Sequence, residues 1–130
     1  MRETTAPQEN PRSELCRRAV SIGEFLQERK ARDILVLDLE GKTGITDYFI
    51  ICTVTSSVQT RALIRDLQEF MRQFDLKSLS ADTVLDSPWV LIDYNYFIVH
   101  IFQQEGRDYY RLEKLWSDAK VVYSDAGGVS

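Results

Sequence analysis

The sequence predicts an α/β fold in which helices flank a small mixed β-sheet of about five strands. Short apolar runs bounded by turn residues, which are typical of strands, alternate with longer stretches whose apolar residues recur at helical spacing. The run at residues 45–54 is apolar on both of its alternating faces, which is typical of a central strand covered on both sides. Helices packed on a sheet in this way define the α/β class.

The first predicted element is a helix over residues 13–30. Ser13 is its candidate N-cap, because a serine hydroxyl can accept a hydrogen bond from the first helical turn. Leu15, Ala19 and Ile22 then recur at helical spacing, so one face of the helix is apolar. An amphipathic helix of this kind covers a sheet.

Two strands are predicted next. Residues 34–39 hold five apolar side chains in six positions and end at the glycine-rich turn of residues 41–44. This Gly-Lys-Thr-Gly sequence is interpreted as a β-turn, because it is too short for a phosphate-binding loop and a strand follows where that motif requires a helix. The second strand is the central one at residues 45–54.

A long second helix begins at the capping hydroxyls of residues 55–57. It carries one broad apolar stripe, formed by Val58, Ala62, Leu63, Leu67, Phe70, Met71 and Phe74. A weaker strand is predicted at residues 76–80, followed by a polar loop. A hairpin comes next, with strands at residues 89–93 and 96–102 joined by a turn at Tyr94-Asn95.

The predicted hairpin has two different faces. A two-residue turn pairs Asp93 with Tyr96, Leu91 with Ile98, and Trp89 with His100. One face is then purely apolar and points at the helices. The other, mixed face consists of Trp89, Asp93, Tyr96, His100 and Phe102.

A last helix is predicted over residues 107–119, and the final residues show no pattern and should fray. We therefore expect a disordered N-terminal tail at residues 1–12, one domain at residues 13–120 and a C-terminal tail at residues 121–130.

Composition excludes several classes of function. The chain has 130 residues and a net charge of −4, and this acidic balance argues against broad contact with phosphate backbones. Cys16 and Cys52 are far apart and form no metal-binding motif with the single histidine. No secretory signal, transit peptide or membrane span is recognisable, so a cytoplasmic location is expected.

An enzymatic function finds weak support in the residues. His100 has no recognisable nucleophilic partner, and a histidine within an apolar strand is expected to be structural. The alternative is a metal-dependent, nucleotidyltransferase-like enzyme that holds phosphate at residues 53–59 and magnesium through Asp47 and Asp93, with Glu105 as a third candidate carboxylate.

Three ordered motifs resemble the ribosomal silencing factor family, also called the Iojap family. They are VLDLEGKTGITDYFIICTVTSSVQ, WVLIDYNYFIVHIF and GRDYYRLEKLW, and the resemblance extends from about residue 15 to residue 118. Two departures are visible, since Val54 and Pro88 stand where the family usually has glycine or a glycine-like residue. Val54 does not readily adopt positive φ, which weakens a phosphate-binding turn.

The resemblance implies a fold similar to that of nucleotidyltransferases but no enzymatic activity. It implies a translational repressor that binds the basic fourteenth protein of the large ribosomal subunit and blocks joining of the small subunit. It also implies a homodimer in some relatives, so a third hypothesis is a homodimeric scaffold that buries the mixed hairpin face.

We expect neither a cofactor nor a metal ion, and no sequence-specific contact with nucleic acid. The expected partner-binding residues combine aromatic side chains with hydrogen-bond acceptors on or beside the mixed hairpin face, and Asp47 is a weaker candidate. They are Trp89, Asp93, Tyr94, His100, Tyr110 and Glu113.

Overall fold

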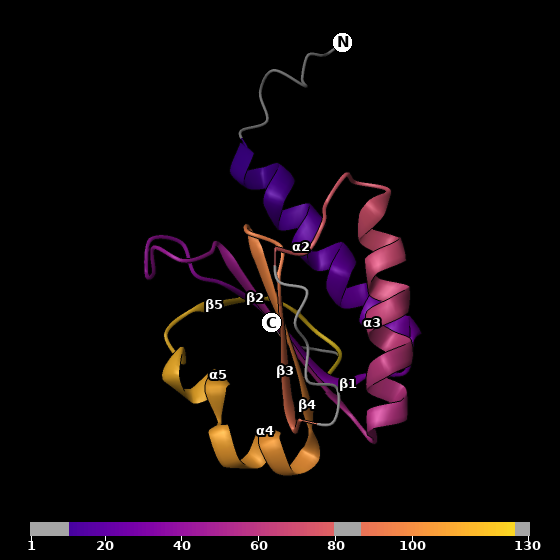
Figure 1. Ribbon diagram of the computed structural model, residues 1–130. Helices are drawn as coiled ribbons and strands as arrows, with labels where there is room; N and C mark the ends of the chain where they lie inside the picture. The colour runs from indigo at the N-terminus through magenta and orange to yellow at the C-terminus, as the bar shows by residue number, and fades with distance from the viewer. Residues whose placement is uncertain (1–10, 80–86, 127–130) are drawn as a thin grey trace.

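A computed structural model describes residues 11–79 and 87–126 of the chain (Figure 1). Its elements, in chain order, are α2 (Pro11–Glu28), β1 (Arg32–Asp38), β2 (Tyr48–Val54), α3 (Ser57–Arg72), β3 (Trp89–Asp93), β4 (Phe97–Gln103), α4 (Gln104–Tyr110), α5 (Leu112–Leu115) and β5 (Lys120–Ser124). No helix within the described ranges is long and apolar enough to cross a membrane.

The five strands form one mixed sheet in the order β3-β4-β2-β1-β5. The central pair, β2 and β4, is parallel, and the other three pairs are antiparallel. Parallel pairing requires a crossover, which helix α3 and strand β3 provide. All seven residues of β2 are buried, so the predicted mixed sheet and its central strand are confirmed.

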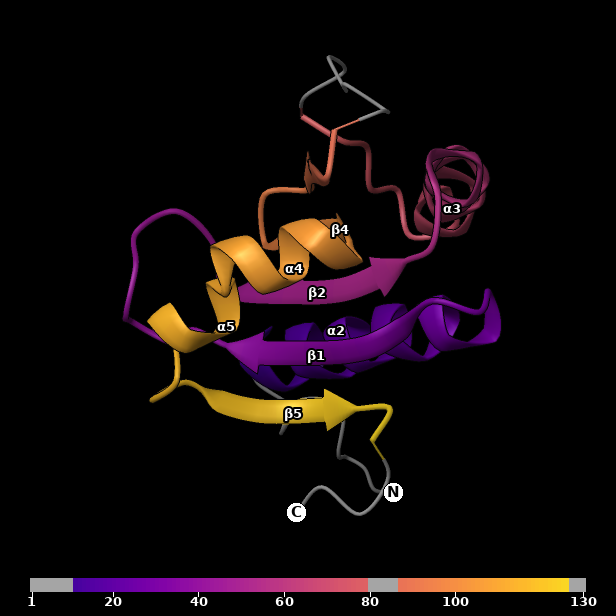
Figure 2. The ribbon, with the colours of Figure 1, turned by 90° about the horizontal axis from the view of Figure 1, so that it is seen from below.

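Helices cover the two faces of the sheet unequally. Helices α2 and α3 pack on one face and enclose the larger core, which includes Leu26, Leu67 and Val99. Helices α4 and α5 lie over the other face, on the opposite side from α2 (Figure 2). Helix α2 begins at Pro11, two residues before the predicted N-cap, and proline is well tolerated in a first helical turn.

The predicted strand at residues 76–80 is wrong for residues 76–79, while Ser80 lies outside the described residues. Asp75 adopts a left-handed conformation with φ of 60°, and the Leu76 N–H donates back to the Met71 carbonyl. The segment therefore wraps around the end of α3. One backbone hydrogen bond connects it to the sheet, from Leu79 N to Asp93 O at 2.6 Å, and Leu76 packs against the larger core.

The fifth strand is instead β5, which takes in residues 121–124 of the predicted C-terminal tail. It pairs antiparallel with β1, matching Val36 with Tyr123 and Leu37 with Val121. The Asp125 carboxylate then accepts a hydrogen bond from Ile34 N at 2.9 Å and fixes the end of the pair. A run of three apolar residues is too short to signal a strand without knowledge of its partner.

The predicted continuous helix at residues 107–119 is also wrong. Arg111 adopts a left-handed conformation, with φ of 50° and ψ of 47°, and separates α4 from α5. Helix α4 starts earlier, at Gln104, directly after β4.

The predicted register of the hairpin is shifted by two residues. Trp89 pairs with Phe102 and Leu91 pairs with His100. The turn is longer than predicted, because the Tyr94 N–H bonds to the Phe97 carbonyl at 2.8 Å and Asn95 adopts positive φ. A shift of two residues keeps every side chain on its predicted face, because side chains alternate with a period of two.

Candidate docking surface

Six ring-bearing side chains gather on the side of the sheet that carries α4 and α5, and we call them the aromatic face. They are Phe49, Trp89, His100, Phe102, Tyr110 and Trp116. Trp89 is central, since its ring centroid lies 5.2 Å from that of Phe102 and 4.7 Å from that of Tyr110. Strands supply the base of this cluster, and α4 contributes Tyr110 at its rim.

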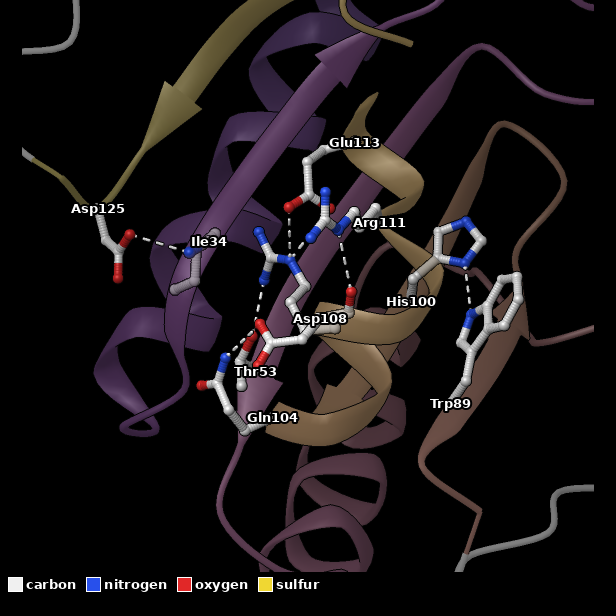
Figure 3. A network of polar contacts seen from close by, with 10 residues as sticks. Ile34, Thr53, Trp89, His100, Gln104, Asp108, Arg111, Glu113 and Asp125 are labelled. Atoms are coloured by element: carbon white, nitrogen blue, oxygen red, sulfur yellow. Dashed lines mark hydrogen bonds and ion pairs between the residues drawn. The ribbon is translucent and has the colours of Figure 1, made fainter. Parts of the chain in front are cut away.

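Trp89 and His100 are joined by a hydrogen bond between neighbouring strands (Figure 3). The Trp89 indole N–H donates to Nδ1 of His100 over 3.0 Å. An indole nitrogen can only donate, so Nδ1 must be unprotonated and the proton of a neutral imidazole must lie on Nε2. Nε2 is itself buried without a hydrogen-bond partner among the described residues.

Burial determines the charge of His100. The residue is 2% exposed, and the Phe49 ring packs edge-on against it at 4.5 Å between centroids. Desolvation lowers the pKa of His100 from 6.5 to about 3, so the imidazole is neutral at physiological pH. The neutral, enclosed imidazole packs beneath the exposed part of the aromatic face.

Arg107 holds α4 and α5 against the sheet. Its Nη1 donates to the Thr53 hydroxyl at 2.7 Å, and its Nε lies 3.2 Å from both carboxylate oxygens of Glu113. The dashed lines that reach Thr53 and Glu113 in Figure 3 mark these contacts. Because Arg107 is 7% exposed, it is buried with a carboxylate to balance its charge.

Sequence reasoning missed this arrangement for a geometric reason. Arg107 and Glu113 are six residues apart, so a continuous helix would place them about 120° apart around its axis and nearly two turns apart along it. The left-handed Arg111 ends α4 and changes the chain direction, which brings the two side chains together. No local pattern marks Arg107 as buried, since it stands between Gly106 and Asp108 in the sequence.

A pocket of about 350 Å³ opens beside this ion pair, between the ends of β1, β5 and α4. Its lining includes the carboxylates of Asp33, Asp108, Glu113 and Asp125, so we call it the acidic pocket. Asp108 accepts a hydrogen bond from Gln104, and Asp125 from Ile34. Within residues 14–79 and 87–126, no three potential ligand side chains are arranged to hold a metal ion.

The structure separates the six expected partner-binding residues. Trp89 and Asp93 are partly exposed on β3, and Tyr110 is 43% exposed on α4. His100 is enclosed beneath them, and Tyr94 is 1% exposed within the core on the opposite face of the sheet.

Glu113, the remaining expected contact, is already paired with Arg107. A carboxylate in that pair helps to set the position of α5, and only part of it is available to a partner, since its side chain is 30% exposed.

Of the three carboxylates considered for metal-dependent catalysis, Glu105 lies away from Asp47 and Asp93. Asp47 lies beside the hairpin turn, because its N–H approaches the Tyr96 carbonyl at 3.2 Å, and Asp93 precedes the same turn. Glu105 follows the far end of the seven-residue strand β4, a length of about 20 Å.

The hydroxyls considered for phosphate binding are engaged in capping α3. Ser56 Oγ accepts from Gln59 N at 3.1 Å, and the Thr55 hydroxyl bonds to the Gln59 side chain at 2.9 Å. Val54 is the buried last residue of β2, so no glycine-like turn is formed there.

The fold and its surface define a small α/β domain whose partly exposed feature is a cluster of aromatic side chains on a mixed sheet. The family model described as "Ribosomal silencing factor during starvation" matches residues 12–129. The chain therefore belongs to the ribosomal silencing factor family, as its three motifs predicted.

Individual relatives agree with this assignment. The chain is 36% identical to the ribosomal silencing factor RsfS of Bacillus subtilis over 100 residues, covering 77% of this chain and 85% of the relative. It is 28% identical to the mouse protein named "Mitochondrial assembly of ribosomal large subunit protein 1", covering 72% of this chain and 42% of the relative. A crystal structure from Chromobacterium violaceum superposes with a TM-score of 0.68 at 26% identity, covering 91% and 98% of the two chains.

Proposed function

We propose that this protein represses translation in the cytoplasm by binding the large ribosomal subunit and blocking the small subunit from joining. The proposed contact is the basic fourteenth protein of the large subunit. The repression is steric, so it requires neither a cofactor nor a metal ion, and no covalent bond is made or broken. Family membership and the mouse relative's name, which refers to the large subunit, support a ribosomal site of action.

The proposed binding surface is chosen on one observation. Apolar and aromatic side chains remain exposed around Trp89. Leu91 is 42% exposed on β3 and Tyr110 is 43% exposed on α4, and both lie on the same side of the sheet as Trp89. Partly exposed aromatic residues that sit in a packed surround are the usual anchors of protein interfaces. We call Trp89, Leu91, Asp93 and Tyr110 the docking surface.

Charge supports a basic partner. The chain has a net charge of −4, and Asp93 lies on the docking surface itself. A negative surface accelerates encounter with a positive protein and disfavours binding to bare RNA. The buried aromatic contacts would then determine how long the complex lasts.

The proposal is tested by a subunit-joining assay with purified large and small subunits. Light scattering should show that excess wild-type protein slows the formation of whole ribosomes. The double variant Leu91→Ala/Tyr110→Ala should lose most of this inhibition, because truncating two interface anchors costs about 2–4 kcal/mol of binding energy. Both side chains are substantially exposed, so folding should be retained.

The matched control is Val58→Ala, which truncates an apolar side chain that is 75% exposed on α3 at the other face of the sheet. This variant should inhibit joining as the wild type does. Unchanged joining in the presence of excess wild-type protein would refute the steric mechanism. Equal inhibition by the double variant and the wild type would instead refute the choice of surface.

A further inference from the structure

A second pocket, of about 270 Å³, lies where the end of α3 meets the β3–β4 turn. Two backbone hydrogen bonds fix the segment at residues 76–79, which forms part of the pocket wall. They run from Leu76 N to Met71 O at 3.2 Å and from Leu79 N to Asp93 O at 2.6 Å. We call this second pocket the donor pocket, because most of its side chains carry N–H or O–H groups. Its lining residues are Gln68, Arg72, Leu76, Lys77, Ser78 and Tyr94.

Tyr94 lines this pocket, and its hydroxyl is buried in an unusual way. Tyr94 is 1% exposed, and its buried hydroxyl has no hydrogen-bond partner within the described residues. Buried polar groups are normally satisfied, so an unsatisfied one beside a pocket indicates a missing partner. Burial raises the pKa of Tyr94 to about 12, so the hydroxyl keeps its proton and can donate it in a hydrogen bond.

The charge of the pocket indicates which partner fits. Arg72 and Lys77 are both cationic, and no carboxylate lines the described part of the pocket. Glu69 pairs with Arg72 at 2.6 Å, but both side chains are about two-thirds exposed or more, and such surface pairs exchange partners at little cost. The carbonyls of Met71 and Arg72 at the helix end already accept hydrogen bonds from the following turn.

We propose that the donor pocket binds the phosphate group of a small phosphorylated molecule. Arg72 and Lys77 supply the opposite charge, Tyr94 supplies a buried hydroxyl donor, and Ser78 and Gln68 supply further donors. The volume accommodates a phosphate with an attached group of about the size of a sugar. The acidic pocket, with its four carboxylates, has the opposite character.

This site is independent of the proposed docking surface. Tyr94 packs into the core beneath α2 and α3, whereas Trp89, Leu91 and Asp93 of the same hairpin face the other side of the sheet. A ligand in the donor pocket would therefore leave the aromatic face uncovered.

The test is a titration of the full chain with ribose 5-phosphate, followed by two-dimensional ¹H–¹⁵N NMR. Saturable shifts should appear at the amides of Lys77, Ser78 and Tyr94, and inorganic phosphate should perturb the same amides more weakly. Ribose should perturb none of them, because it lacks the phosphate. Tyr94→Phe and Lys77→Gln should each weaken binding at least about tenfold, the usual effect of losing a hydrogen bond to a charged group.

Two exposed control substitutions match these changes. Tyr96→Phe removes a hydroxyl from a tyrosine that is 46% exposed at the same turn, and Lys120→Gln removes a charge from β5. Both should bind ribose 5-phosphate as the wild type does. Thermal unfolding of Tyr94→Phe verifies that the variant is folded, and Lys77→Glu provides a second test at an exposed position.

Three results would overturn the proposal. They are the absence of saturable shifts at the pocket amides, an equal loss of affinity in Lys77→Gln and Lys120→Gln, and unchanged affinity in Tyr94→Phe. Tighter binding of a short single-stranded RNA at the same amides would overturn the assignment to a small molecule.

Discussion

The Trp89 indole N–H donates to Nδ1 of His100 over 3.0 Å, and this bond connects the edge strand β3 to the interior of the sheet. It leaves the histidine neutral, with its proton on Nε2. The burial of His100 and its hydrogen bond to Trp89 agree with the structural role that its place in an apolar strand predicts.

Replacing Trp89 with phenylalanine removes the donor while retaining an aromatic ring. We expect Trp89→Phe to lower the free energy of unfolding by about 1–3 kcal/mol, because a buried acceptor is left without a partner. Urea denaturation followed by circular dichroism measures this loss. Trp116→Phe is the matched control, since the Trp116 side chain packs edge-on against Phe49 and its backbone hydrogen bond with Ala119 is unaffected by the substitution. An equal effect of the two substitutions would contradict a specific role for the hydrogen bond.

The pKa of His100 predicts acid sensitivity. The folded pKa of about 3 lies below the unfolded value of 6.5, so the unfolded chain binds a proton first as the pH falls. Stability is therefore complete above pH 6.5 and is lost progressively between pH 6.5 and about 3. Between pH 7.5 and 5.0 the expected loss from this one group is about 2 kcal/mol, measurable by urea denaturation at each pH.

His100→Gln is the reference for that measurement, because it has no titrating group at this position. The comparison uses only the slope of the free energy of unfolding against pH, so any difference in stability between the two proteins at a single pH does not affect it. Above pH 5 most carboxylates are ionised in both states, so they contribute little to the slope. Identical slopes in the wild type and His100→Gln would contradict the lowered pKa, because they would mean that His100 takes up its proton over the same pH range in the folded and unfolded states.

The buried ion pair predicts a large effect of a single charge deletion. Arg107→Met leaves Glu113 and Thr53 without their partner, and we expect a loss of about 2–4 kcal/mol in the free energy of unfolding. Arg72→Met breaks the exposed pair with Glu69 and should cost less than about 1 kcal/mol. Chemical denaturation of both variants compares them directly. Similar losses would mean that Arg107 is solvated in the folded protein.

Gly106 predicts a steric limit at the base of α4. A Cβ at this position would lie 2.4 Å from the Pro88 carbonyl oxygen, which already accepts a hydrogen bond from Gln103 N. Gly106→Ala should therefore displace α4 from β3 and lower the free energy of unfolding by about 1–3 kcal/mol. Gly44→Ala has no atom within 4 Å of the added carbon and should change stability little. Thermal unfolding checks both variants, and equal melting temperatures would show that α4 is not held tightly.

The sequence predicted the elements whose signals are local and long. Periodicity identifies helix α3 and the doubly apolar strand β2, and the structure confirms both elements. The apolar stripe predicted for α3 is wrong at Val58, which is 75% exposed, and it omits the buried Ile64. The hairpin faces were correct even though the register was shifted, because an even shift preserves alternation.

The elements that were missed depend on distant partners. Strand β5 is recognisable only beside β1, and the pairing of Arg107 with Glu113 requires the left-handed Arg111 between them. Tyr94 seemed a surface residue because it occupies a turn, yet its ring enters the core. In each case the deciding contact lies outside the window that a local pattern can cover.

Strand β5 has a mechanical consequence for the helices that precede it. The segment from Gln104 to Ala119 leaves β4 on one side of the sheet centre and returns to the opposite edge at Lys120. Both of its ends join the same sheet, and the Tyr110 ring packs against Trp89 at 4.7 Å between centroids, so folding already restricts the position of Tyr110. A partner that binds there would lose little affinity to immobilising the segment, because folding has already restricted it.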